Sequence, residues 1–395
     1  LKLRASWGQL GNTSSDYDTF SDWYPFYQQQ SISSASSSWL IGGKKQNTAS
    51  MPSIVSSSHT WETIDTWNFG LDWQAFNNRL TGSFDWFVRT TKNMIGPAPK
   101  VNNCDMRSKG WELEIGWRDR IGQVNYGARL NLSDATQKIL TYPNETGSLS
   151  TYYSGMSLNE IWGYETEGIA SSQEEMDAWL ANNKPNWGSS WGAGDVMFKD
   201  LDGDGIVSKG DNTVDNPGDR VVIGNSTPRY RIGLNLDASW KNIDFSVFFQ
   251  GVLKRDYAFG EGDPYFWGAT GNVWQSACCV EHLDYWTESN LDAYYPKPYF
   301  GGITKNQVVQ TRYLQDASYL RCKNIQLGYT LPKYFVKKIG VDNCRVYISC
   351  DNLFTLTKLS SVYDPEALGS YEDYGTSGKT YPLQRTVAFG LSLNF

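Results

Sequence analysis

The sequence predicts an all-β protein, a transmembrane antiparallel β-barrel with long extracellular loops. Three observations lead to this prediction: long segments of alternating apolar and polar residues, very short turns between them, and a chain end that alternates in the same way. Aromatic residues make up 15% of the 395 residues and charged residues 19%, below the roughly 25% of soluble domains. The composition therefore favours strands and long loops.

Five segments alternate without a charge in the apolar phase. In the second of them, Trp111, Leu113 and Ile115 alternate with Glu112 and Glu114. Because successive strand side chains point to opposite faces, each segment has one apolar face and one polar face. The five segments cover residues 80–89, 110–118, 123–133, 229–240 and 243–250.

The length and the ends of these segments favour a membrane over a soluble β-sandwich, which would alternate in the same way. Most run for about ten residues, the length that a tilted strand needs to cross a bilayer. Trp and Tyr lie near their ends, as in an aromatic girdle. The connections at 77–78, 119–122 and 241–242 are short and rich in Asn, Asp and Gly, which suit tight hairpin turns.

The end of the chain alternates once more. Its apolar phase consists of Val387, Phe389, Leu391, Leu393 and Phe395. A β domain that merely ends in a strand is the alternative. A terminal Phe with four apolar residues in phase resembles the signal by which outer-membrane barrels are recognised for insertion, and we assign these five residues to it.

Weaker strands are expected near residues 66–76, 160–165, 319–330 and 344–350, which brings the total to about eleven. The phase slips near Lys323-Asn324, which predicts a β-bulge. An odd number is unusual for a bacterial single-chain barrel and fits half of a 22-stranded one. Since the chain also opens inside an alternating segment, we expect residues 1–395 to be the C-terminal portion of one barrel domain. The stretches 138–227 and 258–317 are expected to be its long extracellular loops.

Several function classes find little support. A net charge of −7 without a Lys and Arg cluster argues against nucleic acid. Only His59 and His282 are available, and the six cysteines form no CxxC pair, so zinc and Ser–His or Cys–His chemistry are disfavoured. Carboxylate number alone leaves a glycosidase pair open, but most strand carboxylates lie among Arg residues in the polar phase, which suits a hydrated lumen. We therefore expect no enzyme.

One loop has the spacing of a divalent-cation site. Carboxylates at positions 1, 3, 5 and 12, Gly205 at position 6 and a backbone carbonyl at position 7 match an EF-hand-type loop. The expected ligands are Asp200, Asp202, Asp204, Ile206 and Asp211. Asp at position 12 shortens the reach relative to Glu, so Ca²⁺ or Mg²⁺ in a structural role is expected. A loop of Asx turns that needs no metal is the alternative.

Other features of the loops concern packing and ligands. Ser172-x-x-Glu175 reads as a capping box and predicts a short helix. Aromatic faces beside hydrogen-bonding groups suit sugar rings, and packing within the loops is the alternative for each of them. The candidate substrate-binding residues are Trp187, Trp191, Trp267 and Trp274.

Several motifs resemble those of the SusC/RagA family of TonB-dependent transporters. They are LKLRASWGQ at 1–9, NNRLTGS at 77–83, DLDGDG at 200–205, FFQG at 248–251, YLR at 319–321 and DNLFT at 351–355. The resemblance runs along the whole chain and matches the C-terminal half of the family's barrel.

The resemblance implies a 22-stranded barrel in the outer membrane of a Gram-negative bacterium, filled by an N-terminal plug and powered through the TonB complex. The plug and the first half of the barrel are absent from this sequence. It also implies a SusD-like lipoprotein partner, contact with outer-membrane lipid, and import of nutrients, with oligosaccharides (glycans) as the leading substrate class. Peptides are the close alternative, and a soluble β-rich glycan-binding protein or glycosidase is a distant one.

Overall fold

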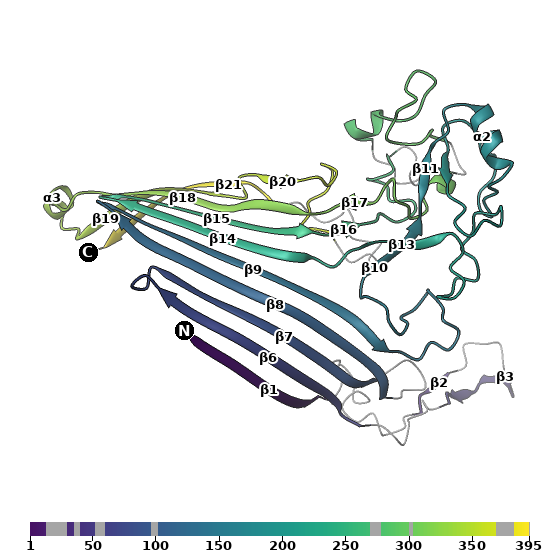
Figure 1. Cartoon of the computed structure of the whole chain (residues 1–395), viewed down its shortest axis with the longest axis horizontal. Coiled ribbons are helices and arrows are strands. Elements are labelled where there is room, and N and C mark those ends of the chain that lie inside the picture. Colours follow the sequence, from purple (N-terminus) through teal and green to yellow (C-terminus); the bar gives the residue numbers. More distant parts are fainter. Residues whose placement is uncertain are drawn as a thin grey trace.

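The structure, a computed structural model, describes residues 1–12, 30–34, 40–51, 60–95, 102–268, 278–299, 303–368 and 383–394. Its main element is an antiparallel sheet of eleven strands (Figure 1). Ten of them follow one another in the order β1 (Lys2–Asn12), β6 (Glu62–Ala75), β7 (Leu80–Ile95), β8 (Asn102–Ile121), β9 (Val124–Thr141), β14 (Arg229–Trp240), β15 (Ile243–Lys254), β18 (Tyr319–Thr330), β19 (Asn343–Asp351) and β21 (Thr386–Asn394).

The eleventh strand differs from the expected one. β20 (Thr355–Thr357) pairs with β18, whereas β10 (Glu160–Tyr164) lies outside the sheet and pairs with β13 (Arg220–Asn225). The prediction that residues 160–165 form a barrel strand was therefore wrong. The segment has the right propensity for a strand, but its hydrogen-bonding partner is another part of the same long loop.

The sheet is curved, and its two ends differ (Figure 1). At one end lie the C-terminus, the hairpin turns and a helical turn made of α3 (Lys333–Val336) and η4 (Lys337–Ile339). At the other end the long loops gather into a compact body. Its elements are β11 (Thr166–Ile169), α2 (Gln173–Leu180), β12 (Val196–Phe198), β16 (Asp256–Tyr257), η2 (Val280–Leu283), η3 (Ile303–Asn306) and β17 (Gln315–Asp316). Small hairpins follow β1: β2 (Ile32–Ser34) pairs with β5 (Asn47–Ala49), and β3 (Leu40–Ile41) pairs with β4 (Lys44–Lys45).

The strand register places the apolar phases of neighbouring strands side by side. Leu234 of β14 lies between Leu130 of β9 and Phe249 of β15. At the free edge, Phe389 and Leu391 are 83% and 60% exposed. Exposed apolar side chains on neighbouring strands form one continuous surface, which is unfavourable in water. This face of the sheet is therefore the one that contacts hydrocarbon.

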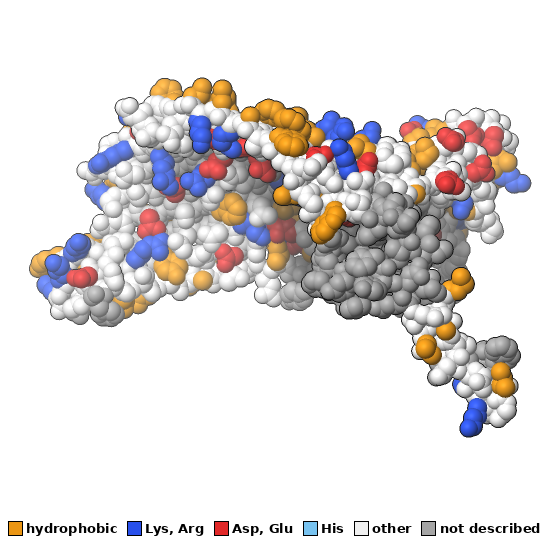
Figure 2. All heavy atoms as spheres, turned by 90° about the horizontal axis from the view of Figure 1, so that it is seen from below, with side chains coloured by type: hydrophobic (Ala, Val, Ile, Leu, Met, Phe, Trp, Pro, Cys, Tyr) orange, Lys and Arg blue, Asp and Glu red, His pale blue; other side chains and the backbone are white. Residues whose placement is uncertain are grey.

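The opposite face of the sheet is polar. Arg4 pairs with both Asp72 and Asp85 at 2.8 Å, and Arg345 pairs with Asp244. Figure 2 shows both the apolar and the polar face of the sheet, with hydrophobic side chains along the upper rim and charged side chains in the hollow below it. The expected division into a lipid-facing and a lumen-facing side is thus present in the described strands.

The bulge predicted in the strand that begins at Tyr319 is confirmed. Phe248 of β15 pairs with Asn324 and Phe249 pairs with Cys322, so Lys323 is the extra residue. The insertion keeps Cys322 and Ile325, which are three positions apart, on the same apolar face. Without it, the apolar phase of β18 would switch to the lumen half-way along the strand.

The short turns also have the expected backbone. Asn77 and Asn78 have φ of 55° and 66°, Gly122 has φ of 61°, and Lys241 has φ of 52°. Positive φ at such positions matches the right-handed twist of the flanking strands. Among the described residues, no helix has the length and the apolar character needed to cross a membrane.

Candidate functional site

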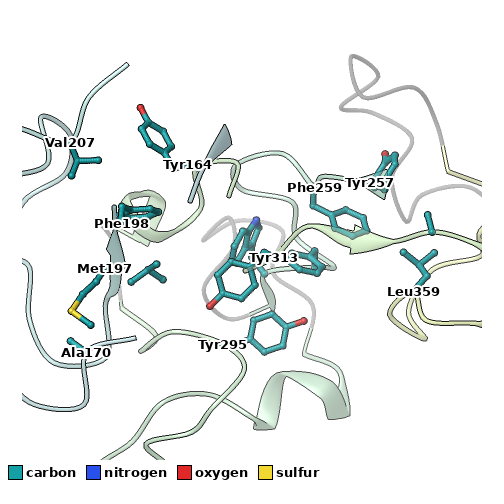
Figure 3. Close-up of a cluster of buried hydrophobic side chains, with 14 of the residues drawn as sticks. Tyr164, Ala170, Met197, Phe198, Val207, Tyr257, Phe259, Tyr295, Tyr313 and Leu359 are labelled. Carbon is teal, nitrogen blue, oxygen red and sulfur yellow. The ribbon is translucent and has the colours of Figure 1, made fainter. Parts of the chain in front are cut away.

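The body formed by the long loops has its own hydrophobic core (Figure 3). Phe198 lies on one side of this cluster, Tyr257 and Phe259 lie on the other, and Tyr313 lies between them. The rings pack at interaction distances, for example 4.8 Å between the centroids of Trp267 and Tyr313. Because these residues come from loops far apart in the sequence, the core fixes the loops relative to one another.

The helix predicted in this body is present. α2 begins after Ser172, whose hydroxyl accepts a hydrogen bond from the Glu175 backbone N–H at 3.2 Å. Glu175 caps the backbone N–H of Ser171, one residue earlier than a standard capping box. Met176 and Trp179 are buried in the core, so the apolar positions of the helix serve packing.

The four candidate Trp residues have different positions. Trp267 is only 2% exposed, and its indole N–H donates to the Gly260 carbonyl at 3.1 Å. A ring without a free face cannot stack on a sugar, so Trp267 is corrected to a core residue. Trp187 and Trp191 are half-buried, with ring centroids 6.2 Å apart, and ligand contact by them stays a prediction. Trp274 lies outside the described residues.

A buried ion pair joins two of the loops. Lys305 and Asp195 are 3% and 0% exposed, and their N···O distance is 2.7 Å. The second carboxylate oxygen of Asp195 accepts from Asn306 Nδ2 at 2.8 Å, and the Gly192 N–H donates to the first. The Lys305 ammonium also lies 4.3 Å from the centroid of the Tyr299 ring. Every charge here has partners, as burial requires.

Three carboxylates converge in the predicted metal loop. Oxygen atoms of Asp200, Asp202 and Asp219 lie within 4.8 Å of one another. Asp219 was missed by the sequence analysis, which placed Asp211 at the twelfth ligand position. The Asp211 carboxylate accepts a hydrogen bond from Asn216 Nδ2 at 2.8 Å and is not part of this group.

A ten-residue excursion explains the exchange of Asp211 for Asp219. Ser208 and Asp219 are joined by backbone and side-chain hydrogen bonds of 3.0 and 2.7 Å, so residues 209–218 loop out between them. A Cβ added at Gly210 would lie 2.6 Å from the Gly218 backbone nitrogen, and one at Gly218 would lie 2.4 Å from the Gly210 nitrogen. Only glycine allows the two chain segments at the base of the excursion to approach this closely.

The hydrogen bonds in the loop are those of Asx turns. Asp200 accepts from the N–H groups of Gly203 and Gly205 at 2.7 and 2.8 Å, and Asp204 accepts from Ile206 at 2.7 Å. Asp219 is fully buried and accepts from Leu201 at 2.6 Å. Each carboxylate oxygen can accept more than one hydrogen bond or ligand, so this network can coexist with a cation.

The electrostatics of the loop place negative charges close together. Desolvation opposes ionisation of Asp200, but the N–H groups of Gly205 and Gly203 outweigh it and lower its pKa. At Asp202, the Asp204 N–H favours ionisation, yet desolvation and the neighbouring carboxylates of Asp219, Asp204 and Asp200 raise its pKa. A bound cation would relieve this repulsion.

A polar hollow lies beside the aromatic core. It has a volume of about 510 Å³ and is lined by charged and aromatic residues of two loops: Glu281, Asp284, Tyr294, Tyr295, Arg312, Asp316 and Lys358. Arg312 is held in place by the carbonyls of Tyr294 and Ala293 at 3.2 and 2.5 Å. The hollow therefore offers both signs of charge next to ring faces, a combination that binds polar ligands.

The six cysteines are free thiols. His282 is 6% exposed, and its ring bonds the Cys279 N–H at 2.9 Å and the Tyr265 carbonyl at 2.9 Å. These hydrogen bonds join two segments of the loop, so His282 has a structural role. His59 lies outside the described residues.

Comparison with known proteins agrees with the fold and the motifs. No family model matches the chain. A TonB-dependent receptor of Formosa agariphila is 27% identical over 431 residues, covering all of this chain and 39% of the relative. The TonB-dependent receptor SusC of Bacteroides thetaiotaomicron is 25% identical over 427 residues, covering all of this chain and 37% of SusC. The chain is a homologue of the SusC-type TonB-dependent receptors.

Solved structures agree on the fold of the chain. The RagAB peptide transporter matches with a TM-score of 0.68 at 24% identity, and the RagAB peptide importer in its open-open state matches with 0.70 at 23%. Each match covers all of the chain and 40% of the solved one. These matches confirm the expected fold class. The TonB-dependent receptors among the sequence relatives confirm the expected outer-membrane location, and their names agree with the expectation of no enzyme.

Proposed function

We propose that this SusC-type chain forms part of the wall and outer vestibule of a nutrient importer. In this proposal the complete protein takes up oligosaccharides, is driven through the TonB complex, and works with a SusD-like lipoprotein. The observation that carries the proposal is the polar, ion-paired face of the sheet, which leads from the loop body along a membrane-embedded wall. A hydrated inner face of this kind suits passage of a polar solute.

The substrate class rests on the loops and the relatives. Oligosaccharides are favoured by the half-buried Trp187 and Trp191, because aromatic rings near hydrogen-bonding groups suit sugars. A second candidate, peptides, is favoured by the polar hollow, where Glu281, Asp316 and Arg312 provide partners for both ends of a zwitterion. The similar solved structures are those of a peptide transporter and peptide importer, RagAB, which agrees with this second candidate.

The experiment uses the complete transporter with its lipoprotein partner, purified together from the outer membrane. Binding is measured by calorimetry against a panel of oligosaccharides and a panel of peptides. We expect at least one oligosaccharide to bind with micromolar or better affinity and peptides to bind weakly. Binding of peptides alone would establish the second candidate, and recovery of the protein without detergent in the soluble phase would contradict both.

We further propose that Asp200, Asp202 and Asp219 hold a structural divalent cation, Ca²⁺ or Mg²⁺. The cation would neutralise three converging carboxylates and thereby tie the loop at 200–208 to the start of β13. Oxygen ligands of this kind are those that such hard cations prefer. The turn of Gly205 and the backbone of Ile206 would complete the loop around it.

Asp219→Asn is expected to weaken Ca²⁺ binding by about tenfold or more, because ligand charge sets the affinity of such loops. Asp211→Asn is the matched control, since Asp211 bonds Asn216 instead, and it should leave the affinity unchanged. Terbium luminescence, sensitised by the nearby Trp residues and competed with Ca²⁺, measures both. Loss of affinity in Asp211→Asn but not in Asp219→Asn would favour the ligand set expected from spacing, and no terbium binding to the unmodified protein would leave the Asx-turn interpretation.

A further inference from the structure

The helical turn at the hairpin end of the sheet carries an exposed pair of aromatic side chains. Tyr334 and Phe335 of α3 are 69% and 61% exposed, and their ring centroids lie 5.5 Å apart. Exposure of two large rings on one short turn is unfavourable in water. We therefore expect lipid or another molecule, and not water, to cover these two rings.

The base of this turn packs on the lipid-facing side of the sheet. Val336 is 2% exposed and packs with Val341 and Cys344, with Leu331 at the margin. Cys344 pairs with Leu393 of β21, and the next residue in the same phase, Val346, pairs with Leu391. Since this is the apolar phase of β19, the turn folds back over the outer face of the barrel wall and away from the lumen.

The turn is continuous with the hydrocarbon-contacting surface. At the level next to it, apolar side chains of four adjacent strands lie in one row: Ile243, Tyr329, Val346 and Leu391, which are 40–60% exposed. The neighbouring turn contributes Trp240, whose ring lies 4.9 Å from the Lys241 ammonium. Aromatic rings and lysines in this arrangement mark the boundary between hydrocarbon and headgroups.

The charge of the turn is strongly positive. Lys333, Lys337 and Lys338 are all exposed, and Asp342 is the acidic residue that follows them in the sequence. The Lys338 ammonium lies 4.4 Å from the Tyr334 ring centroid, so the positive charge and the aromatic ring lie side by side. Gly340, with φ of 74°, ends the turn and directs the chain back into β19.

We propose that residues 332–340 form an anionic-phospholipid site at the hairpin end of the barrel. Tyr334 and Phe335 enter the boundary between headgroups and acyl chains, and the three lysines bind the phosphates of acidic headgroups. Lysine stems can lie along apolar surface while their ammonium groups reach the headgroup layer. The proposal depends on the barrel fold and is independent of what the complete protein imports.

The test uses the complete transporter, transferred from detergent into an equimolar mixture of phosphatidylglycerol and phosphatidylcholine. Native mass spectrometry then measures how much of each lipid stays bound to the protein. The unmodified protein should retain phosphatidylglycerol in preference by about tenfold or more, because each of the three lysines contributes about 1 kcal/mol to binding an acidic headgroup layer. Lys333→Gln, Lys337→Gln and Lys338→Gln together should bring the ratio close to one. The matched control replaces Lys44, Lys45 and Lys184, which are exposed at the loop end, and should keep the preference.

A second variant separates the rings from the charges. Tyr334→Ser with Phe335→Ser should lower retention of both lipids and leave their ratio unchanged. Heat-modifiable mobility in electrophoresis confirms that each variant has a folded barrel. The proposal is overturned if the unmodified protein shows no preference, or if the control loses it equally. It is also overturned if the lysine variant loses a co-purifying periplasmic protein while its lipid ratio stays unchanged.

Discussion

Leu234→Arg is expected to prevent assembly of the barrel in the outer membrane. Leu234 lies at the middle of β14 and is flanked in register by Leu130 and Phe249. An Arg on the lipid-facing side near the midplane costs about 2–4 kcal/mol. Since its two cross-strand partners, Leu130 and Phe249, are apolar, the guanidinium has no carboxylate directly opposite it. The measurement is the fraction of protein that shows heat-modifiable mobility in purified outer membranes.

Asn235→Arg is the matched control for this prediction. The side chain of the next residue points to the opposite face of the strand, where Asn235, Arg129 and Asp237 line a hollow of about 480 Å³. A longer cationic side chain has room in this hollow, and the Asp237 carboxylate on the same face offsets the like charge of Arg129, which is the cross-strand partner of residue 235, so assembly should remain close to that of the unmodified protein. Comparable loss in both variants would mean that the apolar rows do not face hydrocarbon.

The parts of the fold that could be predicted from the sequence are those that depend on the alternation of apolar and polar residues along a strand. Alternation fixes which side of a strand is apolar, so the faces of β7, β8, β9, β14 and β15 were predictable. The bulge at Lys323 was also predictable, because a change of phase within one strand requires an extra residue. The turn at Asn77-Asn78 was predictable from residues that tolerate positive φ.

The loop body was predicted less well, because its contacts are between distant residues. Residues 160–165 have strand character, but their partner Arg220–Asn225 lies some 60 residues later, so nothing local told a loop sheet from the barrel sheet. Trp267 could equally have been exposed, since its burial depends on Tyr313 and Phe266. Loops lack a period from which burial can be inferred.

The metal loop illustrates the same limit at a single residue. The spacing of Asp200, Asp202 and Asp204 was sufficient to find the loop, but the third converging carboxylate, that of Asp219, follows an excursion of ten residues. The available signal was the Gly210 and Gly218 pair that brackets the excursion, with Asp219 directly before a strand. A fixed twelve-residue template assigned Asp211 in its place.

Lys305→Met is expected to produce the largest local loss of stability in the loop body. It leaves the fully buried Asp195 carboxylate without its counter-charge, although the hydrogen bonds from Asn306 and Gly192 remain. Removing one partner of a buried ion pair costs about 3–5 kcal/mol. The loss should be confined to the loop body, since the sheet does not contain this pair. Hydrogen exchange of residues 187–198 and 303–308, compared with residues of β14, measures it.

Two further variants distinguish charge from packing. Lys199→Met removes a pair of similar length, 2.8 Å to Glu165, whose side chains are 46% and 38% exposed, and exposed pairs contribute little to stability. Its exchange rates should hardly change. Lys305→Met combined with Asp195→Asn removes both buried charges and should recover part of the lost protection. If the double variant were no better than Lys305→Met, the aliphatic stem of Lys305 and its contact with Tyr299, and not the ion pair, would hold the loops together.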